Sequence, residues 1–532
     1  MEAKGQAFSR LHSTSWVLLH SLVVVLCLTS LVTGLRIATQ TRPEVLHFSA
    51  LLPQGNMHGL HFFSAVGLLS IVIAYFLHLI LFRESRSQIR RGASHYHQSV
   101  FWLGRALVLA SLVSGVMLYV DRFAMATLVE IHYLAALAWV LYLLIHGGVY
   151  FVQYGWLTVK RIVISKQVHV RNDAAILVIL LAAFGVMFTW TQSAARHELL
   201  VKLVSPKEQV RIDGIADETA WDGAEALTLN TIGGANFLNG QTRITIKALH
   251  NGTGAFFLVR WYDPSKSLQH LPLVKTEAGW KVTESGFYHF DETEYYEDKL
   301  ALIISKNCSV AAAGTARLGP NPLKDKVPNW HGKGYHYAAD GEVHDLWHWK
   351  AVRTNDMFVA DDNLIGPPDI VRKGMRRYTA GYLTDPKESG GYVMNWQWYR
   401  QSGVVPRRMP QQPEALVPYQ SGNGEDLSWS VPWYSYDLYD ASSDVYPVGT
   451  IMPSVLYMSN RMEGDRADVY AHGRWADGQW TLEMMRRFDT NSGWDVKLES
   501  GVCLWVAAFD HAQVAHTRHM QPIQLTFESD DD

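Results

Sequence analysis

Two histidines stand 14 residues apart in the apolar run IHYLAALAWVLYLLIHGG, which covers residues 131–148. In an α-helix 14 residues turn through about 1400°, about 40° short of four turns, and rise about 21 Å, so His132 and His146 share one face near opposite ends of the run. Ionisable side chains inside a membrane are rare and by default mark a functional site. Because imidazole is an axial ligand of haem iron, the spacing predicts two stacked haems, each taking one ligand from this helix.

The run lies within one of five uncharged windows in the first 195 residues, whereas charged residues are frequent after them. A transmembrane helix needs about 20 apolar residues. Four windows meet this length, and the third reaches it when Val100–Gly104 is included and the side chain of Arg105 extends to the interface. The sequence therefore predicts a membrane all-α bundle of five transmembrane helices, with a four-helix haem-binding core. The windows are Ser15–Leu35, Met57–Phe82, Ala106–Val120, Ile131–Val159 and Ala174–Ala195.

Lysine and arginine are concentrated on one side of these helices, at the N-terminus, in the second loop (RESRSQIRR) and in the fourth loop. Basic residues favour cytoplasmic loops, so the N-terminus is expected in the cytoplasm and everything after Ala195 outside it. The first window is too long for a cleaved signal peptide and is expected to remain as an anchor. We expect a multi-pass protein of the bacterial cytoplasmic (inner) membrane, in contact with lipid, whose C-terminal domain is periplasmic.

This orientation offers each histidine of the fourth helix a partner at the same depth. His20 lies near the inner surface, as does His146, while His58 and His61 lie at the outer start of the second helix, level with His132. The predicted ligand pairs are His20–His146 and His132 with either His58 or His61. His61 is preferred to His58 because it sits deeper.

The polar region after residue 197 shows strand patterns instead of helical ones. Segments such as TRITIKALHN, GAFFLVRWYD and GVCLWVAAFD are short, rich in β-branched and aromatic residues, and bounded by turn residues. RWADGQWTLEMM predicts a β-hairpin around Asp477–Gly478. The pattern favours an extracytoplasmic all-β sandwich with long loops, the loop-rich centre (about 306–450) decorating it. Of the three cysteines only Cys308 and Cys503 could form a disulfide there, and no C-x-x-C-H motif for covalent haem occurs.

The first helix, LHSLVVVLCLTSLVTGLRIA, resembles that of bacterial di-haem cytochromes of the cytochrome b561-like type, the membrane subunits of nickel–iron hydrogenases and formate dehydrogenases. The fourth helix of that family carries two histidines with the spacing of His132 and His146, and the resemblance covers about residues 8–160. It implies a b-type cytochrome with two b haems that exchanges electrons with quinone or quinol. The family more usually has His-Trp where this chain has His-Ser.

Residues 205–527 resemble the haem-binding γ subunit of ethylbenzene dehydrogenase. The resemblance rests on VRIDGIADETAWDGAEALTL, on VHDLWHWKAVRT followed by the acidic pair at 361–362, and on the closing strands WADGQWTLEMMRRFDT and VAAFDHAQVAHTRHMQPIQL. It implies a β-sandwich that holds one b haem between a methionine and a lysine. No methionine occurs between residues 290 and 350, so His336 is expected in its place, and the lysine is expected to be Lys387 or, in competition, Lys350.

Together these features predict a cytochrome b-type domain (1–172), a fifth helix and linker (173–196) and a periplasmic sandwich (197–532). The expected function is electron transfer between the quinone pool and a periplasmic redox protein or molybdoenzyme-type subunit, through two membrane haems and a third haem outside. The protein is then an electron-transfer component, and whether it is part of a quinol-linked oxidoreductase stays open. The alternatives are an outer sandwich that is a haem-free ligand-binding or sensing module, and a self-contained periplasm-facing reductase. No nucleic-acid partner is expected.

Overall fold

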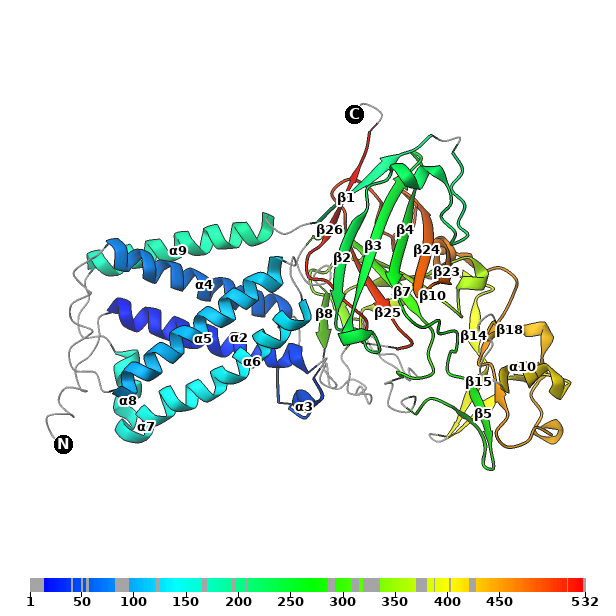
Figure 1. The fold of residues 1–532 in the computed structure, drawn as a ribbon, viewed down its shortest axis with the longest axis horizontal. Helices are drawn as coiled ribbons and strands as arrows, with labels where there is room; N and C mark the ends of the chain where they lie inside the picture. Colours follow the sequence, from blue (N-terminus) through cyan, green and yellow to red (C-terminus); the bar gives the residue numbers. More distant parts are fainter. Residues whose placement is uncertain are drawn as a thin grey trace. The chain divides into compact units, whose positions relative to one another are not determined.

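The chain divides into two compact units, residues 1–195 and 196–532, which are coloured blue to cyan and green to red in Figure 1. The computed structural model describes residues 14–39, 42–48, 51–53, 57–81, 95–120, 125–164, 170–193, 197–205, 208–285, 287, 292–308, 315–318, 335–369, 380–386, 388–400, 403–420, 427–513 and 515–529.

The first unit contains the five expected helices that are long and apolar enough to cross a membrane. The third includes Val100–Gly104 as predicted and begins slightly earlier, at Gln98. The fourth is interrupted by one π-helical turn, η2, between α6 and α7. The helices of this unit are α2 (Thr14–Ala38), α3 (Pro43–Leu46), α4 (Met57–Leu81), α5 (His95–Val120), α6 (Met125–Leu143), η2 (Leu144–Gly148), α7 (Val149–Tyr154), α8 (Trp156–Val163) and α9 (Val170–Ser193).

Small and hydroxyl residues hold the helices together in pairs, which is how helices associate where lipid removes the hydrophobic driving force. Between α2 and α4 the Ser30 and Ser64 hydroxyls are 2.6 Å apart. Between α5 and α6 the Trp139 indole donates to the Ser111 hydroxyl at 3.0 Å. The Tyr96 hydroxyl donates to the carbonyl of Ile145 in the π-helical turn, so α5 is tied to the irregular part of the fourth span.

The second unit is built on a sheet with the strand order β12-β11-β10-β7-β25-β26-β1-β3-β4-β24-β23, with β2 paired to β3. The two halves of the sheet enclose one apolar core, so the unit is the predicted sandwich. Pairing is antiparallel except at β1, which runs parallel to both β26 and β3, a feature the sequence did not reveal. The strands are β1 (His197–Leu203), β2 (Leu227–Ile232), β3 (Gln241–His250), β4 (Gly254–Tyr262), β7 (Lys299–Ser305), β10 (His344–Lys350), β11 (Asp361–Ile365), β12 (Tyr382–Thr384), β23 (Tyr470–Ala476), β24 (Gln479–Arg487), β25 (Cys503–Phe509) and β26 (Ile523–Phe527).

Alternation along β10 decides which of its residues enter the sandwich. Trp347 and Trp349 are fully buried in the core, where Trp349 packs edge-on against Trp480 of β24 at 5.0 Å. The hairpin between β23 and β24 turns at Asp477–Gly478 as predicted, and both turn residues have the positive φ that a tight two-residue hairpin turn requires.

The loop-rich centre has more order than the sequence indicated, because its short strands form small sheets with an apolar core of their own. The Cys308–Cys503 disulfide predicted as possible is present. The remaining strands are β5 (Leu273–Thr276), β6 (Gly279–Val282), β8 (Thr315–Leu318), β9 (Tyr335–Ala338), β13 (Glu388–Ser389), β14 (Tyr392–Met394), β15 (Trp396–Arg400), β16 (Gly403–Pro406), β17 (Arg408–Met409), β18 (Ser430–Pro432), β19 (Asp437–Leu438), β20 (Ile451–Met452), β21 (Val455–Tyr457) and β22 (Glu463–Gly464).

Candidate functional site

The rings of His61 on α4 and His132 on α6 face one another inside the helical unit. Their centroids are 6.2 Å apart and their planes are nearly perpendicular, at 87°. The structure thus brings together the two histidines preferred for the outer pair. His58 lies one helical turn before His61 on α4.

Helix α2 fixes the tautomer of His61. Its Nδ1 lies 3.0 Å from the Ser30 carbonyl oxygen and 3.0 Å from the Thr33 hydroxyl. A carbonyl only accepts, and the Thr33 hydroxyl already donates to the carbonyl of Thr29 at 2.7 Å. Nδ1 must therefore carry the proton of the neutral ring, which leaves Nε2 with a free lone pair.

Helix α5 does the same for His132. Its Nδ1 lies 2.9 Å from the Ser114 hydroxyl, which itself donates to the Ala110 carbonyl at 2.7 Å. The Ser111 carbonyl is a second acceptor for this ring. His132 is thus also an Nδ1–H tautomer whose Nε2 keeps a lone pair, the state in which imidazole binds a metal ion.

The two segments that hold these imidazoles, which we call cradles, have nearly the same sequence. Residues 30–34 read SLVTG on α2 and residues 111–115 read SLVSG on α5. In each, the serine and the hydroxyl residue three positions later contact the imidazole, and the final glycine lies under it. A Cβ on Gly34 would lie 3.1 Å from Cε1 of His61, and one on Gly115 would lie 3.3 Å from Cε1 of His132. This repeat is the signal by which the sequence could have revealed residues that support the ligands.

The spacing of the two rings fits a single shared metal ion. With a metal–nitrogen bond of about 2.0–2.1 Å and a ring nitrogen about 1.2 Å from the centroid, two imidazoles on opposite sides of one ion have centroids about 6.4 Å apart. The observed separation is 6.2 Å. The separation of the rings therefore leaves room for one iron, and His61 and His132 are the residues that would hold it.

The second predicted pair also comes together, since His20 on α2 lies close enough to His146 for an electrostatic interaction. Aromatic side chains one turn away stack on both rings, Trp16 on His20 at 4.6 Å and Tyr142 on His146 at 5.2 Å. Nδ1 of His20 is buried and makes no hydrogen bond within the described part of the chain. His146 lies in the π-helical turn, a distortion of a kind that is frequent at functional sites.

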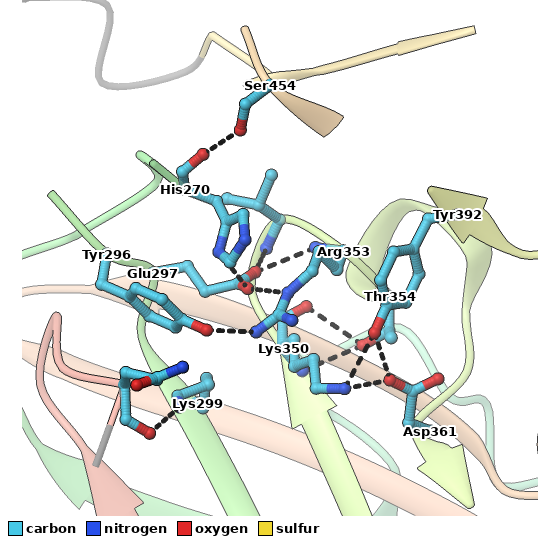
Figure 2. Close-up of polar contacts among 12 residues, drawn as sticks. His270, Tyr296, Glu297, Lys299, Lys350, Arg353, Thr354, Asp361, Tyr392 and Ser454 are labelled. Atoms are coloured by element: carbon cyan, nitrogen blue, oxygen red, sulfur yellow. Dashed lines mark hydrogen bonds and ion pairs between the residues drawn. The ribbon is translucent and has the colours of Figure 1, made fainter. Parts of the chain in front are cut away.

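The candidates in the sandwich do not form a comparable pair. His336 is exposed on the short strand β9, and Lys387 lies outside the described residues. Lys350 is buried on β10, where its ammonium forms an ion pair with Asp361 and a 3.0 Å hydrogen bond with Tyr392 (Figure 2). Burial lowers the pKa of Lys350 to about 8 against the attraction of Asp361. An ion-paired ammonium has no lone pair for iron, so Lys350 in this arrangement does not fit the ligand role.

Lys350 belongs to a buried polar network in which each carboxylate is paired with at least one cation. Glu297 pairs with Arg353 and accepts hydrogen bonds from the backbone amides of Val352 and Arg353 at 2.6 and 2.9 Å (Figure 2). His270 lies 3.1 Å from the same carboxylate. The network joins β10 to the segment before β7, which is an architectural role.

His348 is a buried imidazole that the sequence reasoning passed over. On β10 it faces away from the core, beside Lys350, and its ring stacks on Phe509 at 5.4 Å. Its Nε2 is buried without a hydrogen-bond partner in the described part of the chain. The alternation in HDLWHWK could have placed it, because core positions for the two tryptophans put His344, His348 and Lys350 on the opposite face.

The family model described as ethylbenzene dehydrogenase matches residues 218–521, more than half of the chain. No curated protein was found to match.

Two solved structures show distant similarity. A carbohydrate binding module of family 9 from Caldicellulosiruptor kristjanssonii, in complex with glucose, is 10% identical with a TM-score of 0.23, over 63% of this chain and 97% of that one. A putative carbohydrate-binding protein from Bacteroides uniformis is 9% identical with a TM-score of 0.26, over 62% of this chain and 99% of that one. TM-scores this low do not establish a shared fold.

Proposed function

Because the chain belongs to the ethylbenzene dehydrogenase family through residues 218–521, we propose that it is a membrane-bound multi-haem electron-transfer protein. The family assignment supports a redox role, and the helical unit supplies the means of carrying electrons through a membrane. The observation that carries the proposal is the His61–His132 pair, with both tautomers set for metal binding and a ring separation of 6.2 Å.

In this proposal His61 and His132 hold one b haem and His20 and His146 hold a second. Haem iron supplies a reversible one-electron change, and the protein determines its position and potential. The hydroxyl and carbonyl acceptors of SLVTG and SLVSG hold the Nδ1 side of each imidazole, so Nε2 would be the atom that binds iron. The glycines at the end of each cradle leave space beside the rings.

The proposed electron path continues from the membrane haems into the sandwich. Family membership is consistent with a third haem in residues 197–532 and with a periplasmic redox partner of the molybdoenzyme type. Its ligands are open, with His336, Lys387 and the newly located His348 as candidates. Quinone or quinol on the membrane side completes the proposed route, with the N-terminus cytoplasmic and the sandwich periplasmic.

A cavity in the sandwich favours one alternative, a haem-free ligand-binding module. Its volume is about 330 Å³, and tryptophans and polar groups line it together, among them Trp429, Trp475, Asp356 and His472. Aromatic faces beside hydrogen-bonding groups suit a sugar or a small aromatic molecule. In that case the sandwich carries no haem, and the helical unit alone is redox-active.

The test is the number of haems per chain in the full-length protein purified in detergent, by the pyridine haemochrome assay with reduced-minus-oxidised spectra. Three b haems support the complete proposal. Two haems, both lost on replacing membrane histidines, would leave the sandwich as a binding module. A chain that binds no haem after expression with excess haem would refute the electron-transfer proposal.

The His58 alternative is resolved by a matched pair of variants on one helix. His61→Ala is expected to lose one haem, and His58→Ala to keep full occupancy. Loss of haem from His58→Ala alone would reverse the assignment.

A further inference from the structure

Five aspartates from five separate segments converge inside the sandwich, and we call them the five-aspartate cluster: Asp345 on β10, Asp362 on β11, Asp385 after β12, Asp468 before β23 and Asp495 between β24 and β25. Asp345, Asp362 and Asp495 each offer a carboxylate oxygen, and these three oxygens lie within 4.8 Å of one another. None of these residues takes part in the proposed haem sites.

The fold places the cluster on the core side of two adjacent strands. Asp362 pairs across the ladder with Trp347, and Asp345 pairs with Leu364, so both carboxylates point the same way as the core side chains. The Asp385 amide donates to the carbonyl of Asp362 at 3.3 Å, which brings that loop alongside. The Val496 amide donates to Asp345 at 3.3 Å, which anchors the loop that carries Asp495.

The cluster holds more carboxyl groups than the cations around it can pair with. Within the described residues Arg486 is the cation that contacts it, and it pairs with one oxygen of Asp345. The other charged groups that act on these aspartates are the remaining aspartates of the cluster. Five carboxyl groups therefore face one guanidinium, whereas Asp361 and Glu297 elsewhere in the unit are each paired with a cation.

The carboxylate oxygens also lack donors. Asp362 is completely buried and Asp385 is 2% exposed, and in the described part of the chain neither oxygen of either residue accepts a hydrogen bond from an N–H or hydroxyl group. Their hydrogen-bonding neighbours are other carboxyl groups, Asp468 for Asp362 and Asp495 for Asp385. One oxygen each of Asp345, Asp468 and Asp495 is in the same state. Burial, together with the neighbouring carboxylates, raises the pKa of Asp362 and Asp385. An ionised carboxylate in this position is strongly unfavourable unless a cation compensates it.

We propose that the five-aspartate cluster is a binding site for a divalent cation of the Ca²⁺ type. The ligands would be Asp345, Asp362 and Asp495, with Asp385 and Asp468 completing the shell. Hard carboxylate oxygens without nitrogen or sulfur donors suit Ca²⁺ or Mg²⁺ and not Zn²⁺. The number of carboxylate oxygens without donors favours Ca²⁺, because it takes six to eight oxygens in flexible geometry, while Mg²⁺ keeps several waters.

A second acidic group in the unit shows the contrast. Asp298, Asp510 and His511 also lie within 4.8 Å of one another. There the Asp298 carboxylate already accepts hydrogen bonds from the Ser267 amide at 2.7 Å, the His511 amide at 3.0 Å and the Trp480 indole at 3.1 Å. The oxygens of Asp298 are therefore already hydrogen-bonded by the protein, so this group provides the control.

The experiment uses the full-length protein in detergent. Bound calcium per chain is measured after gel filtration in chelator-free buffer, followed by EGTA treatment and titration with Ca²⁺ or with Tb³⁺ as a luminescent probe. Excitation at the tryptophan band should sensitise Tb³⁺, since Trp347 stands across the ladder from Asp362. We expect one EGTA-removable Ca²⁺ per chain and a lower melting temperature of the sandwich after its removal.

The variants Asp362→Asn and Asp495→Asn are expected to weaken Ca²⁺ binding by about tenfold or more, since ligand charge sets calcium affinity. Asp495 is only half-buried on a loop, so its variant remains informative if Asp362→Asn does not fold. Asp510→Asn is expected to bind as the parent does. Equal binding by the parent and Asp495→Asn, or a melting temperature that EGTA leaves unchanged, would overturn the proposal. Neither result depends on haem content.

Discussion

In the helical unit His61 and His132 donate through Nδ1 to groups of a neighbouring helix, His61 to the Ser30 carbonyl and His132 to the Ser114 hydroxyl. In the sandwich the network of Figure 2 sets charged groups against opposite charges, as Glu297 is against Arg353 and Lys350 against Asp361. The first arrangement leaves one lone pair per ring exposed to a ligand. In the second arrangement the charged groups are already bound to one another, so none of them is available to a ligand.

This difference separates residues that are available for chemistry from residues that maintain the fold. A buried polar group with all its partners supplied is architectural, however unusual its environment. A buried group is a candidate ligand when one of its polar atoms has no partner although the residues around it are well ordered. By that criterion His20, His348 and the five-aspartate cluster are candidates. The groups of Figure 2 are bound to opposite charges, as His270 is to Glu297 and Asp361 is to Lys350.

The largest effect should come from breaking a membrane pair. His132→Ala removes one of two imidazoles from the proposed outer iron site, and we expect complete loss of one b haem per chain while the second is retained. The measurement is the haem-to-chain ratio with low-temperature reduced-minus-oxidised spectra, which separate the two α-bands. The exposed His47 serves as the control, since His47→Ala should leave both haems in place. Full occupancy in His132→Ala would show that the ring pair is only structural.

The next effect tests the matched charges of the sandwich. Glu297→Gln leaves the Arg353 guanidinium buried without its counter-charge, which costs about 3–5 kcal/mol in the free energy of unfolding. The measurement is denaturant unfolding followed by tryptophan fluorescence, which reports mainly on the sandwich. The exposed pair Arg461–Glu463 is the control, and Glu463→Gln should cost less than about 1 kcal/mol.

The pH dependence of stability tests the same pair, Glu297 and Arg353. Burial alone would raise the pKa of Glu297, but Arg353 and His270 outweigh it and hold that pKa well below its ordinary value of 4.5. The contribution of an acid with a lowered pKa is present above the unfolded value and is lost as the pH falls below it. The stability difference between the parent and Glu297→Gln should therefore shrink as the pH falls below about 4.5. A difference that is constant with pH would exclude the charge pair as its cause.

The sequence predicted which side chains meet in the helical unit, but it predicted few of the side-chain contacts in the sandwich. Helical periodicity and membrane depth were enough to bring His61 to His132 and His20 to His146, because a spanning helix fixes both the face and the height of each residue. In a sandwich with long connections, the spacing of residues along the sequence does not show which residues of different strands lie together. Lys350 was a candidate ligand by its position in the chain, but its carboxylate partner Asp361 comes from the next strand, and only the register of β10 and β11 shows that they meet.

The five-aspartate cluster was even harder to predict from the sequence. Its members extend from residue 345 to residue 495, and no local motif joins them. The acidic pair at 361–362 was visible, but its two members face opposite sides of the sheet, Asp361 toward Lys350 and Asp362 toward the cluster. Alternation predicts that they separate, whereas the pairing of distant segments decides what each one meets.

The smallest effect should come from the cradles, where the ligand stays and only its support changes. Ser114→Ala removes the hydroxyl acceptor of His132 but leaves the Ser111 carbonyl, so we expect the haem to remain bound with an affinity lower by about 10–100-fold. The measurement is the rate and extent of haem transfer from the detergent-solubilised protein to an excess of apomyoglobin. Ser70→Ala is the matched control, because Ser70 makes the same backbone hydrogen bond within α4, at 2.7 Å. If both serine variants behave like the parent, the hydroxyl does not tune the ligand and the carbonyl alone sets the tautomer. If Ser114→Ala releases haem as readily as His132→Ala, the SLVSG cradle is as necessary to the site as the imidazole that it holds.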